Sequence, residues 1–574
     1  MNPIDLLPVP RPLEDTSPMT ETDFYFNVVH PMIPDIIKLM LIGIPVDLTK
    51  VKDLEAVLDD TITKANRILS DNPRIIKFMQ SINLKGYNDK RRVYSYYYKD
   101  FNVSKEEHRK YVINYILKKQ DKPLLEKCSK KEYLNYEFSL GITDITIKEA
   151  MVQLAEEKAD IYNRSINIDS TFNAASPLQK KQFFEFWKLP SEKGKYDRDA
   201  LSVLLNQTDD DMLKEAIQAM IDISYAGIVR NNFVEAFYNY TYEGRIYGNV
   251  KLFGSKAFRI TSSEPNLLNM PSTGSIYAKP IKKLLVSSDK DHVIYQVDLS
   301  ALEDVTIANL SRDKNKCAIF LDGIDGHCMN SYYYFRNEIE KELPRLPDET
   351  EHDYIRRYKQ AVEDGNKVLK KIRQKSKAVT FGLSFGCFPK KIAQTIKCSM
   401  KEATEIFNNY HNKLYFSING LREAIARYAD RHKYIPLGLG CTLHTDNISK
   451  DIRTVFNAYT QFWDVISLLT MNKLNTLIKE NNMQDKIEII STIYDAIYFN
   501  VAKDAKVIHW LNNNVIKLLT TDMFYGIIVH NSAEGEIGYN WTDTVHIPNN
   551  ANIFMIKHCL EELDGRSTDS SAVS

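Results

Sequence analysis

Two isolated aspartates lie at positions where strands are expected to end. Asp298 follows the apolar run Val293–Val297, which is typical of a short buried strand. Asp495 lies in STIYDAIYFNV, between two β-rich runs that predict a hairpin with Tyr494-Asp495 as its turn. Aspartate often caps such turns, which is the simplest interpretation of Asp495. The chemical alternative is that the two carboxylates hold two Mg²⁺ ions, or Mn²⁺, about 3.5–4 Å apart for phosphoryl displacement.

A helical stripe of cations and aromatic rings is the second feature. In RQKSKAVTFGLSFG, four side chains recur every four residues and share one helix face: Arg373, Lys377, Phe381 and Phe385. The cations could hold the phosphates of a nucleoside triphosphate while a ring stacks on its base. The same spacing also occurs on half-buried helices that bind nothing.

A third stripe, Arg453, Asn457 and Gln461, has the same fourfold spacing. Polar stripes are usually solvated, but aromatic residues flank this one. Side chains of these types can donate to the minor-groove acceptors, which are similar in every base pair, so they could test base-pair geometry without reading sequence.

The composition limits the kinds of partner. Lys+Arg 75 balances Asp+Glu 75, so a nucleic-acid surface must be a local patch. Seven scattered cysteines without a CxxC pair favour a reducing compartment and argue against a zinc site. The apolar segment around Ile36–Val46 is interrupted by Lys38 and is shorter than a membrane span needs. We therefore expect a soluble intracellular protein with no membrane partner.

Most of the chain has helical periodicity. It predicts helices over Pro31–Leu69, with a break near Gly43–Pro45, and over Ile147–Ile228, residues 350–430 and about Ile452–Lys479. Residues 1–27 are rich in proline and are expected to form a loose arm.

A segment at about residues 80–145 differs in composition. Between Asp89 and Tyr136 it has 13 Lys/Arg and 7 Asp/Glu, interleaved with tyrosines. Basic residues among aromatic rings suit phosphate contact and base stacking. An ordinary solvated helical pair with buried tyrosines fits the composition equally well.

Together these stretches resemble, in order and spacing, the motifs of the family A (DNA polymerase I-like) DNA polymerases. VDLSALE, RQKSKAVTFGLSFG and IYDAIYF look like motifs A, B and C. FRITSSEPNLLNMPS resembles the primer-template stretch, and DGHCMN resembles the segment whose histidine approaches the triphosphate. SPLQKKQFFEFWKLP resembles a thumb segment, and IGYNW resembles the end of the family's chains. The resemblance extends from about residue 28 to 541.

The resemblance implies an α+β, right-hand polymerase fold, with an antiparallel sheet in the palm and helical fingers and thumb. The implied regions are an arm (1–27), a thumb-like helical region with the basic insertion at about 80–145 (28–230), palm (231–312), fingers (313–435), palm (436–545) and a C-terminal tail (546–574).

Residue roles follow from the motifs. Asp298 and Asp495 would bind the two catalytic metal ions, and Lys377 would protonate the leaving pyrophosphate. The dNTP would contact Arg373, Lys377, His327, Phe381 and Phe385, and Glu303 would be a steric gate against a 2′-hydroxyl. Primer-template DNA would contact Arg259, Asn266, Asn269, Arg453, Asn457 and Gln461. The implied reaction is template-directed addition of dNTPs to a primer 3′-hydroxyl.

The chain departs from the family pattern at several positions. Ala496 replaces the usual glutamate of motif C, Leu299 the usual tyrosine of motif A, Ala301 a usual glutamine, and Phe385 a usual tyrosine. Only about 27 residues precede the thumb-like pattern, so we expect no 3′–5′ proofreading by this chain and an exonuclease on a separate polypeptide.

Two expectations concern the biological setting. The basic insertion could grip DNA or recruit a processivity factor. The divergent motifs favour a bacteriophage replication enzyme in the cytoplasm of its host.

Two rival functions stay open from the sequence. One is a single-subunit RNA polymerase, which shares the palm and a related fingers helix. The other is a polymerase-shaped DNA-binding protein that has lost catalysis, suggested by Ala496.

Overall fold

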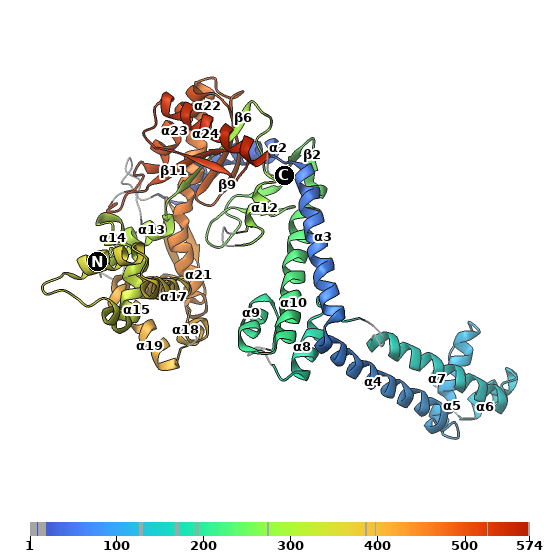
Figure 1. The fold of residues 1–574 in the computed structure, drawn as a ribbon. Helices are drawn as coiled ribbons and strands as arrows, with labels where there is room; N and C mark the ends of the chain where they lie inside the picture. The colour runs from blue at the N-terminus through green and yellow to red at the C-terminus, as the bar shows by residue number, and fades with distance from the viewer. Residues whose placement is uncertain are drawn as a thin grey trace. The chain divides into compact units, whose positions relative to one another are not determined.

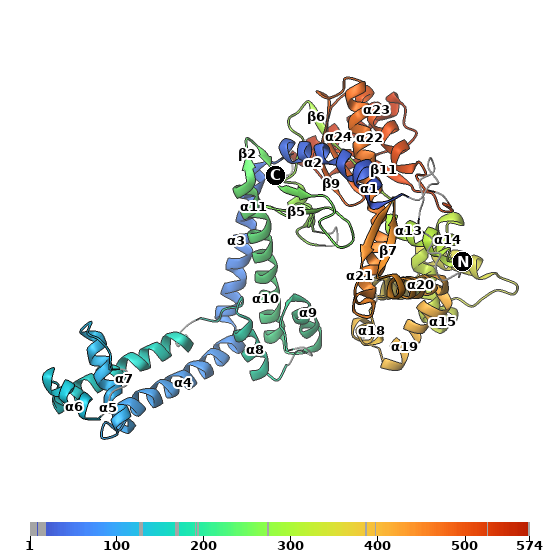
Figure 2. The same cartoon turned by 180° about the vertical axis from the view of Figure 1, so that it is seen from behind.

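The computed structural model describes residues 9, 19–125, 130–166, 171–189, 191, 194–271, 275–384, 387–396, 398–524 and 526–571. The chain divides into two compact units (Figures 1 and 2). Unit 1 comprises residues 1–52 and 235–574, and unit 2 comprises residues 53–234. The predicted thumb-like region began at residue 28, but residues 28–52 belong to unit 1.

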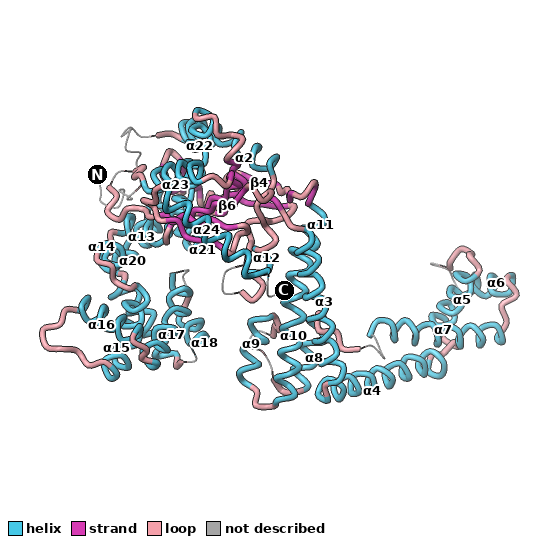
Figure 3. The backbone as a smooth tube through the Cα atoms, turned by 45° about the horizontal axis from the view of Figure 1, so that its top comes forward, coloured by secondary structure: helices cyan, strands magenta, loops and turns pink. Residues whose placement is uncertain are grey.

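Unit 1 is built on a five-stranded antiparallel sheet with the order β12-β11-β6-β10-β9 (strands in magenta in Figure 3). Its strands are β6 (His292–Leu299), β9 (Ile487–Ile493), β10 (Ala496–Ala502), β11 (Ala533–Gly538) and β12 (Thr544–Ile547). The expected buried strand and hairpin are therefore confirmed. Smaller sheets pair β1 (Ile44–Pro45), β3 (Arg245–Ile246) and β2 (Thr241–Tyr242); β4 (Asn249–Lys251) and β5 (Thr261–Ser263); and β7 (Tyr434–Gly438) and β8 (Cys441–His444).

Helices cover one face of the five-stranded sheet. Tyr295 and Val297 of β6 point to that face and join its core, and the Tyr295 hydroxyl donates to Asn512 Oδ1 at 2.8 Å. The covering helices are α22 (Val465–Glu480), α23 (Ala505–Thr520) and α24 (Ile553–Ser571). Because side chains alternate along a strand, Gln296 and Asp298 point to the opposite face.

The region predicted to form the fingers, residues 313–435, is largely helical, as expected. It follows α13 (Leu302–Ser311), which lies in the predicted palm. Its helices are α14 (Lys314–Leu321), α15 (Gly326–Glu342), α16 (Glu351–Glu363), α17 (Lys367–Ser384), α18 (Pro389–Ile396), α19 (Met400–Asn409), η5 (Tyr410–Leu414) and α20 (Phe416–His432). The predicted helix over Ile452–Lys479 is interrupted: α21 (Ile448–Gln461) leads through a short 3₁₀ turn, η6 (Phe462–Asp464), into α22.

Both ends of the chain contain helices that the sequence analysis did not predict. The predicted arm includes α1 (Glu21–Phe24) and most of η2 (Tyr25–Val29), and Phe24 is buried in the unit 1 core. Most of the predicted tail forms α24, where Ile556 and Leu563 are buried. Unit 1 also contains α11 (Glu235–Tyr240) and α12 (Ala278–Lys282).

One helical stretch among the described residues, Glu21–Ile42, is long and apolar enough to cross a membrane by length and composition alone. This stretch begins well before the apolar segment around Ile36–Val46 that the sequence prediction considered. Within this stretch, α2 (His30–Ile42) packs Met32, Ile36 and Leu39 into the core beside α22 and β9. Asp35 accepts hydrogen bonds from the Asn472 and Asn475 amides at 2.6 and 2.9 Å, so α2 has specific contacts with the protein.

The described elements of unit 2 are helices. They are α3 (Leu48–Asp71, which begins in unit 1), α4 (Pro73–Ser95), η3 (Tyr96–Asp100), α5 (Glu106–Lys119), α6 (Lys130–Ser139), α7 (Asp144–Ile166), α8 (Pro177–Phe186), α9 (Arg198–Gln207), α10 (Asp211–Val229) and η4 (Arg230–Val234). One core joins the end of α3, the start of α4, and α8–α10. The basic insertion has separate small cores among η3, α5, α6 and α7.

Candidate active site

The pairing of β6 with β10 brings the two predicted metal-binding aspartates together. Asp298 is the register partner of Ala496, and the Leu299 amide donates to the Asp495 carbonyl at 3.3 Å. Asp495 therefore lies at the β9–β10 turn, diagonally across from Asp298. Hydrogen bonding between these two strands places residues that are distant in the sequence at the same end of the sheet.

The region around Asp298 carries uncompensated negative charge. Its side chain reaches solvent, but the surrounding atoms displace part of its hydration water, and Asp495, Glu536 and Glu534 repel its negative form. Desolvation and this repulsion raise the pKa of Asp298 to about 7, although Lys282 opposes the shift. Desolvation also raises the pKa of Asp495, against a lowering effect of Arg259.

Glu534 and Glu536 were not singled out from the sequence. Both lie on β11, and Glu534 is the register partner of Asp298. Glu536 accepts hydrogen bonds from Gln296 Nε2 at 2.8 Å and Thr544 Oγ1 at 2.7 Å. The alternation in AEGEIG is a readable strand signal, but it does not reveal that β11 pairs with β6.

This donor set fits Mg²⁺. The described residues contain no group of three or more His, Cys, Asp or Glu side chains that could hold a metal ion. Mg²⁺ commonly binds one or two carboxylates and completes its coordination with water and substrate phosphates. Asp298 and Asp495 supply the two carboxylates, and the surplus negative charge around them favours a divalent cation.

The predicted phosphate-binding residues lie together on α15 and α17. Arg373 Nη2 is 2.7 Å from Asp325 Oδ2, and Asp325 caps α15 by accepting from the Cys328 amide. Burial lowers the pKa of His327, and the positive charges of Lys377 and Arg373 lower it further. Asp325, which the sequence analysis did not assign a role, thus holds Arg373 beside His327.

Neither of the two aromatic side chains predicted on α17 lies in the described part of the structure. Phe385 lies outside the described residues. Phe381 lies on α17, but its side chain is outside the described part of the chain. Their proposed contacts with the nucleotide stay predictions.

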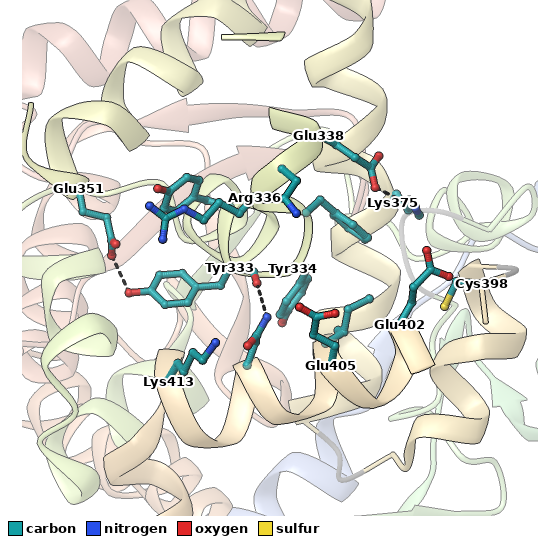
Figure 4. Close-up of a pocket in the computed structure, with 15 residues that line it drawn as sticks. Tyr333, Tyr334, Arg336, Glu338, Glu351, Lys375, Cys398, Glu402, Glu405 and Lys413 are labelled. Atoms are coloured by element: carbon teal, nitrogen blue, oxygen red, sulfur yellow. Dashed lines mark hydrogen bonds and ion pairs between the residues drawn. The ribbon is translucent and has the colours of Figure 1, made fainter. Parts of the chain in front are cut away.

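A pocket of about 300 Å³ lies beside α17 (Figure 4), and the side chain that this helix contributes to it is Lys375. The pocket lies among α15, α17 and α19 and contains none of the predicted site residues. Lys375 lines it, with its ammonium 4.3 Å from the Phe335 ring centroid and 4.0 Å from Glu338. Lys375 therefore points away from the α17 face that carries Arg373 and Lys377, although it lies between them in sequence.

The stripe of polar residues on α21 that was predicted to contact primer-template DNA extends from solvent into the site. Arg453 is exposed, Asn457 is half-buried and Gln461 is buried. Gln461 Nε2 donates to Glu303 Oε1 at 3.3 Å, which holds the predicted gate residue in place. Desolvation raises the pKa of Glu303, against the lowering effects of Arg259 and Gln461.

The other predicted primer-template residues flank β5: Arg259 precedes it, and Asn266 and Asn269 follow it. Asn266 and Asn269 are exposed, and Asn266 accepts a hydrogen bond from the Leu268 amide at 3.2 Å. Arg259 is ion-paired with Asp464, a residue that sequence reasoning missed.

Residues 143–346 and 349–543 match the sequence model of the family described as DNA polymerase family A. The chain belongs to DNA polymerase family A. The match begins beyond most of the basic insertion. It includes every predicted site residue, from Arg259 to Asp495.

Individual comparisons agree with this family A assignment. DNA polymerase I of Caldicellulosiruptor bescii is 24% identical over 277 residues, which is 46% of this chain and 28% of the relative. DNA polymerase I of Helicobacter pylori strain J99 is 27% identical over 177 residues, 30% of this chain and 16% of the relative. The matched part of the chain spans less than a third of the length of these relatives.

A solved structure supports the family A fold. The POL domain of Pol1 from M. smegmatis, in complex with DNA primer-template and dNTP, aligns with a TM-score of 0.60 at 18% identity. The alignment covers 90% of this chain and 71% of that chain. The predicted α+β polymerase fold is confirmed.

Proposed function

We propose that this chain is a template-directed DNA polymerase that adds dNTPs to a primer 3′-hydroxyl. The observation that carries the proposal is the placement of Asp298, on β6, beside the β9–β10 turn that carries Asp495, with surplus negative charge around Asp298. The cations Arg373 and Lys377, with the imidazole of His327 beside them, give independent support because they suit a triphosphate.

In the proposed mechanism, Asp298 and Asp495 hold two divalent ions. Bound Mg²⁺ would help activate the primer hydroxyl and stabilise the charge on the phosphoryl oxygens. Arg373, Lys377 and His327 would bind the triphosphate, and Lys377 Nζ would give a proton to the leaving pyrophosphate. Arg373 would exchange its bond to Asp325 for phosphate oxygens.

Extension of a labelled primer on a DNA template tests this function. With Mg²⁺ and four dNTPs, wild-type protein should lengthen the primer in template order. A single-subunit RNA polymerase would instead prefer rNTPs, and a protein that has lost catalysis would bind the primer-template without extending it. Either result would overturn the proposal.

Replacing Glu303 by Ala should admit ribonucleotides. Gln461 holds the Glu303 carboxylate, and in our proposal this side chain occupies the space that a 2′-hydroxyl would need. We expect the preference for dNTP over rNTP to fall about 10- to 100-fold, as for other steric exclusions. Single-nucleotide insertion of dATP and ATP opposite one template base measures the ratio, with dATP insertion as the internal control. An unchanged ratio would place the gate elsewhere.

We also propose a narrower biological setting. The chain would act in bacteriophage DNA replication in the cytoplasm of the host, and a separate polypeptide would supply 3′–5′ exonuclease activity. The divergent positions Leu299, Ala301 and Ala496 support a line distant from the cellular enzymes. Degradation of a mismatched primer by the pure protein, unaffected by changes at Asp298 or Asp495, would contradict the separate exonuclease.

We propose that the basic insertion contacts DNA. Tyr97 packs inward against the core of Phe101, Val112 and Ile116. Five exposed side chains of α4 and η3 form a surface that we call the basic–aromatic face: Arg91, Arg92, Tyr96, Tyr98 and Lys99. Tyr98 stacks on Tyr94, and Tyr96 packs edge-on against Phe101. Because Tyr96 and Tyr98 are still 45% and 46% exposed, each ring keeps a part that a base could contact.

Two acids of the insertion pair with cations outside this face: Glu106 pairs with Lys110 at 2.8 Å, and Glu137 pairs with Arg109. Arg92 lies 3.6 Å from Asp89, but the arginine is 84% exposed, and such surface pairs contribute little. The basic–aromatic face therefore keeps a net positive charge that complements phosphates.

Neutralising this face should weaken DNA binding and make the binding constant less dependent on salt concentration. For Arg91→Gln/Arg92→Gln/Lys99→Gln, we expect the slope of log K against log[salt] for single-stranded DNA to fall by about 2, at ~0.7 per lost phosphate contact. Fluorescence anisotropy of labelled DNA measures it. The matched control is Lys64→Gln/Arg67→Gln/Lys148→Gln, which removes the same charge from exposed positions of unit 2. Equal slopes in the two variants would exclude DNA from this face and favour a protein processivity factor.

A further inference from the structure

Asp464 is a buried carboxylate beside the candidate active site. It ends η6, at the junction between α21 and α22, and its exposed fraction is 8%. Arg259 Nε donates to its Oδ2. A charged group at this depth is retained only with a partner, so this ion pair fixes the position of the arginine. Desolvation raises the pKa of Asp464 to about 6, against the lowering effect of Arg259.

The arginine in turn contacts the turn that carries Asp495. The Arg259 guanidinium lies 4.8 Å from the centroid of the Tyr494 ring, a cation–π distance. Tyr494 has φ 56°, a left-handed conformation that is unfavourable for a tyrosine and needs support from its surroundings. The side chain on Tyr494 therefore links Arg259 to the backbone next to Asp495.

Arg259 is also fixed from its own side of the site. Its amide donates to Ser255 Oγ at 3.0 Å, and the Ser255 amide donates to its carbonyl at 3.3 Å. The ion pair with Asp464 uses Nε, so the two terminal amino groups remain for Tyr494 and for DNA. The segment that ends at Asp464 also contains Gln461, which holds Glu303.

We propose that Asp464 is a positioning residue: it holds Arg259 against Tyr494 and thereby fixes the turn that presents Asp495. This inference rests on the proposed polymerase function and adds a specific role to a residue that is not one of the proposed metal ligands. Its effect passes through Arg259 to the Tyr494 ring, so it predicts coupling between positions 464 and 494. A purely structural ion pair would stabilise the junction of α21 and α22 without such coupling.

A double-mutant cycle tests this coupling. Asp464→Asn keeps the shape but removes the charge, and Tyr494→Leu removes the ring. Each should lower kcat for primer extension about tenfold or more, with less change in KM for dNTP. The double variant should be little worse than either single variant, because both break one chain of contacts. Asp464→Glu restores the charge and should recover part of the loss, and Asp446→Asn, at an exposed position, is the matched control.

A second readout keeps the test independent of catalysis. Mn²⁺ titration followed by electron paramagnetic resonance should show about tenfold weaker binding in Asp464→Asn than in wild type, as when groups that orient a metal ligand are removed. Thermal denaturation confirms that each variant is folded. Near-wild-type kcat and Mn²⁺ affinity in folded Asp464→Asn, or losses that multiply in the double variant, would overturn the inference. If wild-type protein extends no primer but the Mn²⁺ difference persists, the polymerase function fails and the positioning role stands.

Discussion

Asp495→Asn should reduce primer extension at least about 1,000-fold and leave the fold intact. The change removes the carboxylate at the β9–β10 turn, beside Asp298 of β6, and a bound metal ion supplies several kcal/mol of transition-state stabilisation. Asn keeps the size of the side chain, and Asp495 is only partly buried, so little packing is lost. Steady-state extension at saturating dNTP, with thermal denaturation of the same samples, measures both effects.

The matched control is Asp485→Asn, which removes an exposed carboxylate shortly before β9 in the same hairpin region. It should retain wild-type extension. If Asp495→Asn kept more than about a tenth of wild-type activity, Asp495 would not be a metal ligand needed for the reaction. Protonation should act in the same direction as the substitution. Because the pKa of Asp298 without metal is raised to about 7, protons should compete with Mg²⁺ for this carboxylate, and wild-type activity at subsaturating Mg²⁺ should fall as the pH drops through that value.

Lys377→Ala should lower kcat about 100- to 1,000-fold, the second-largest effect that we expect. The substitution removes an ammonium that would stabilise the triphosphate and give a proton to pyrophosphate. The charge of Lys377 lowers the pKa of His327, so the two side chains lie close enough to interact electrostatically. Rapid-quench kinetics of a single insertion would separate this loss in chemistry from product release.

Lys375→Ala is a close control for that prediction. Lys375 lies on the same helix, two residues away, but it packs on Phe335 beside the pocket in Figure 4. Its removal should change kcat by less than about threefold. Similar losses in the two variants would indicate a general weakening of α17 in place of a specific role for Lys377.

Local patterns predicted much of the fold. The run Val293–Val297 read as a buried strand, and it forms β6. The hairpin around Asp495 and the helix carrying Arg373 were also readable, because alternation and fourfold spacing are properties of a single segment. The interruption at η6 was not predicted: Asp464, which ends it, pairs with Arg259, a residue about 200 positions earlier that local spacing does not reveal.

Two errors at the chain ends came from giving composition more weight than local signals. Thr20 and Asp23 form a capping box at α1, and that Thr-x-x-Asp pattern is visible in the sequence. Ile553, Ile556, Leu560 and Leu563 have helical spacing in α24. The proline-rich start and serine-rich end obscured both helices.

The candidate site was predictable only in part. Asp298, Asp495, Arg373 and Lys377 stand in short motifs, so their types and spacing could be interpreted directly. The acids that surround them could not, because Glu534 reaches Asp298 only through the pairing of β11 with β6. Likewise, nothing near Asp325 in the sequence indicates that its partner would be Arg373 of α17.

Divalent-ion binding by Asp298 and Asp495 is the central claim, and Mn²⁺ titration of the full chain measures it most directly. With a 3′-deoxy primer-template and a matching dNTP, electron paramagnetic resonance should count two bound Mn²⁺ ions per wild-type chain. Asp298→Asn and Asp495→Asn should each lose at least one of these ions, and Asp485→Asn should keep both. Equal Mn²⁺ binding by wild type and both site variants would contradict the claim.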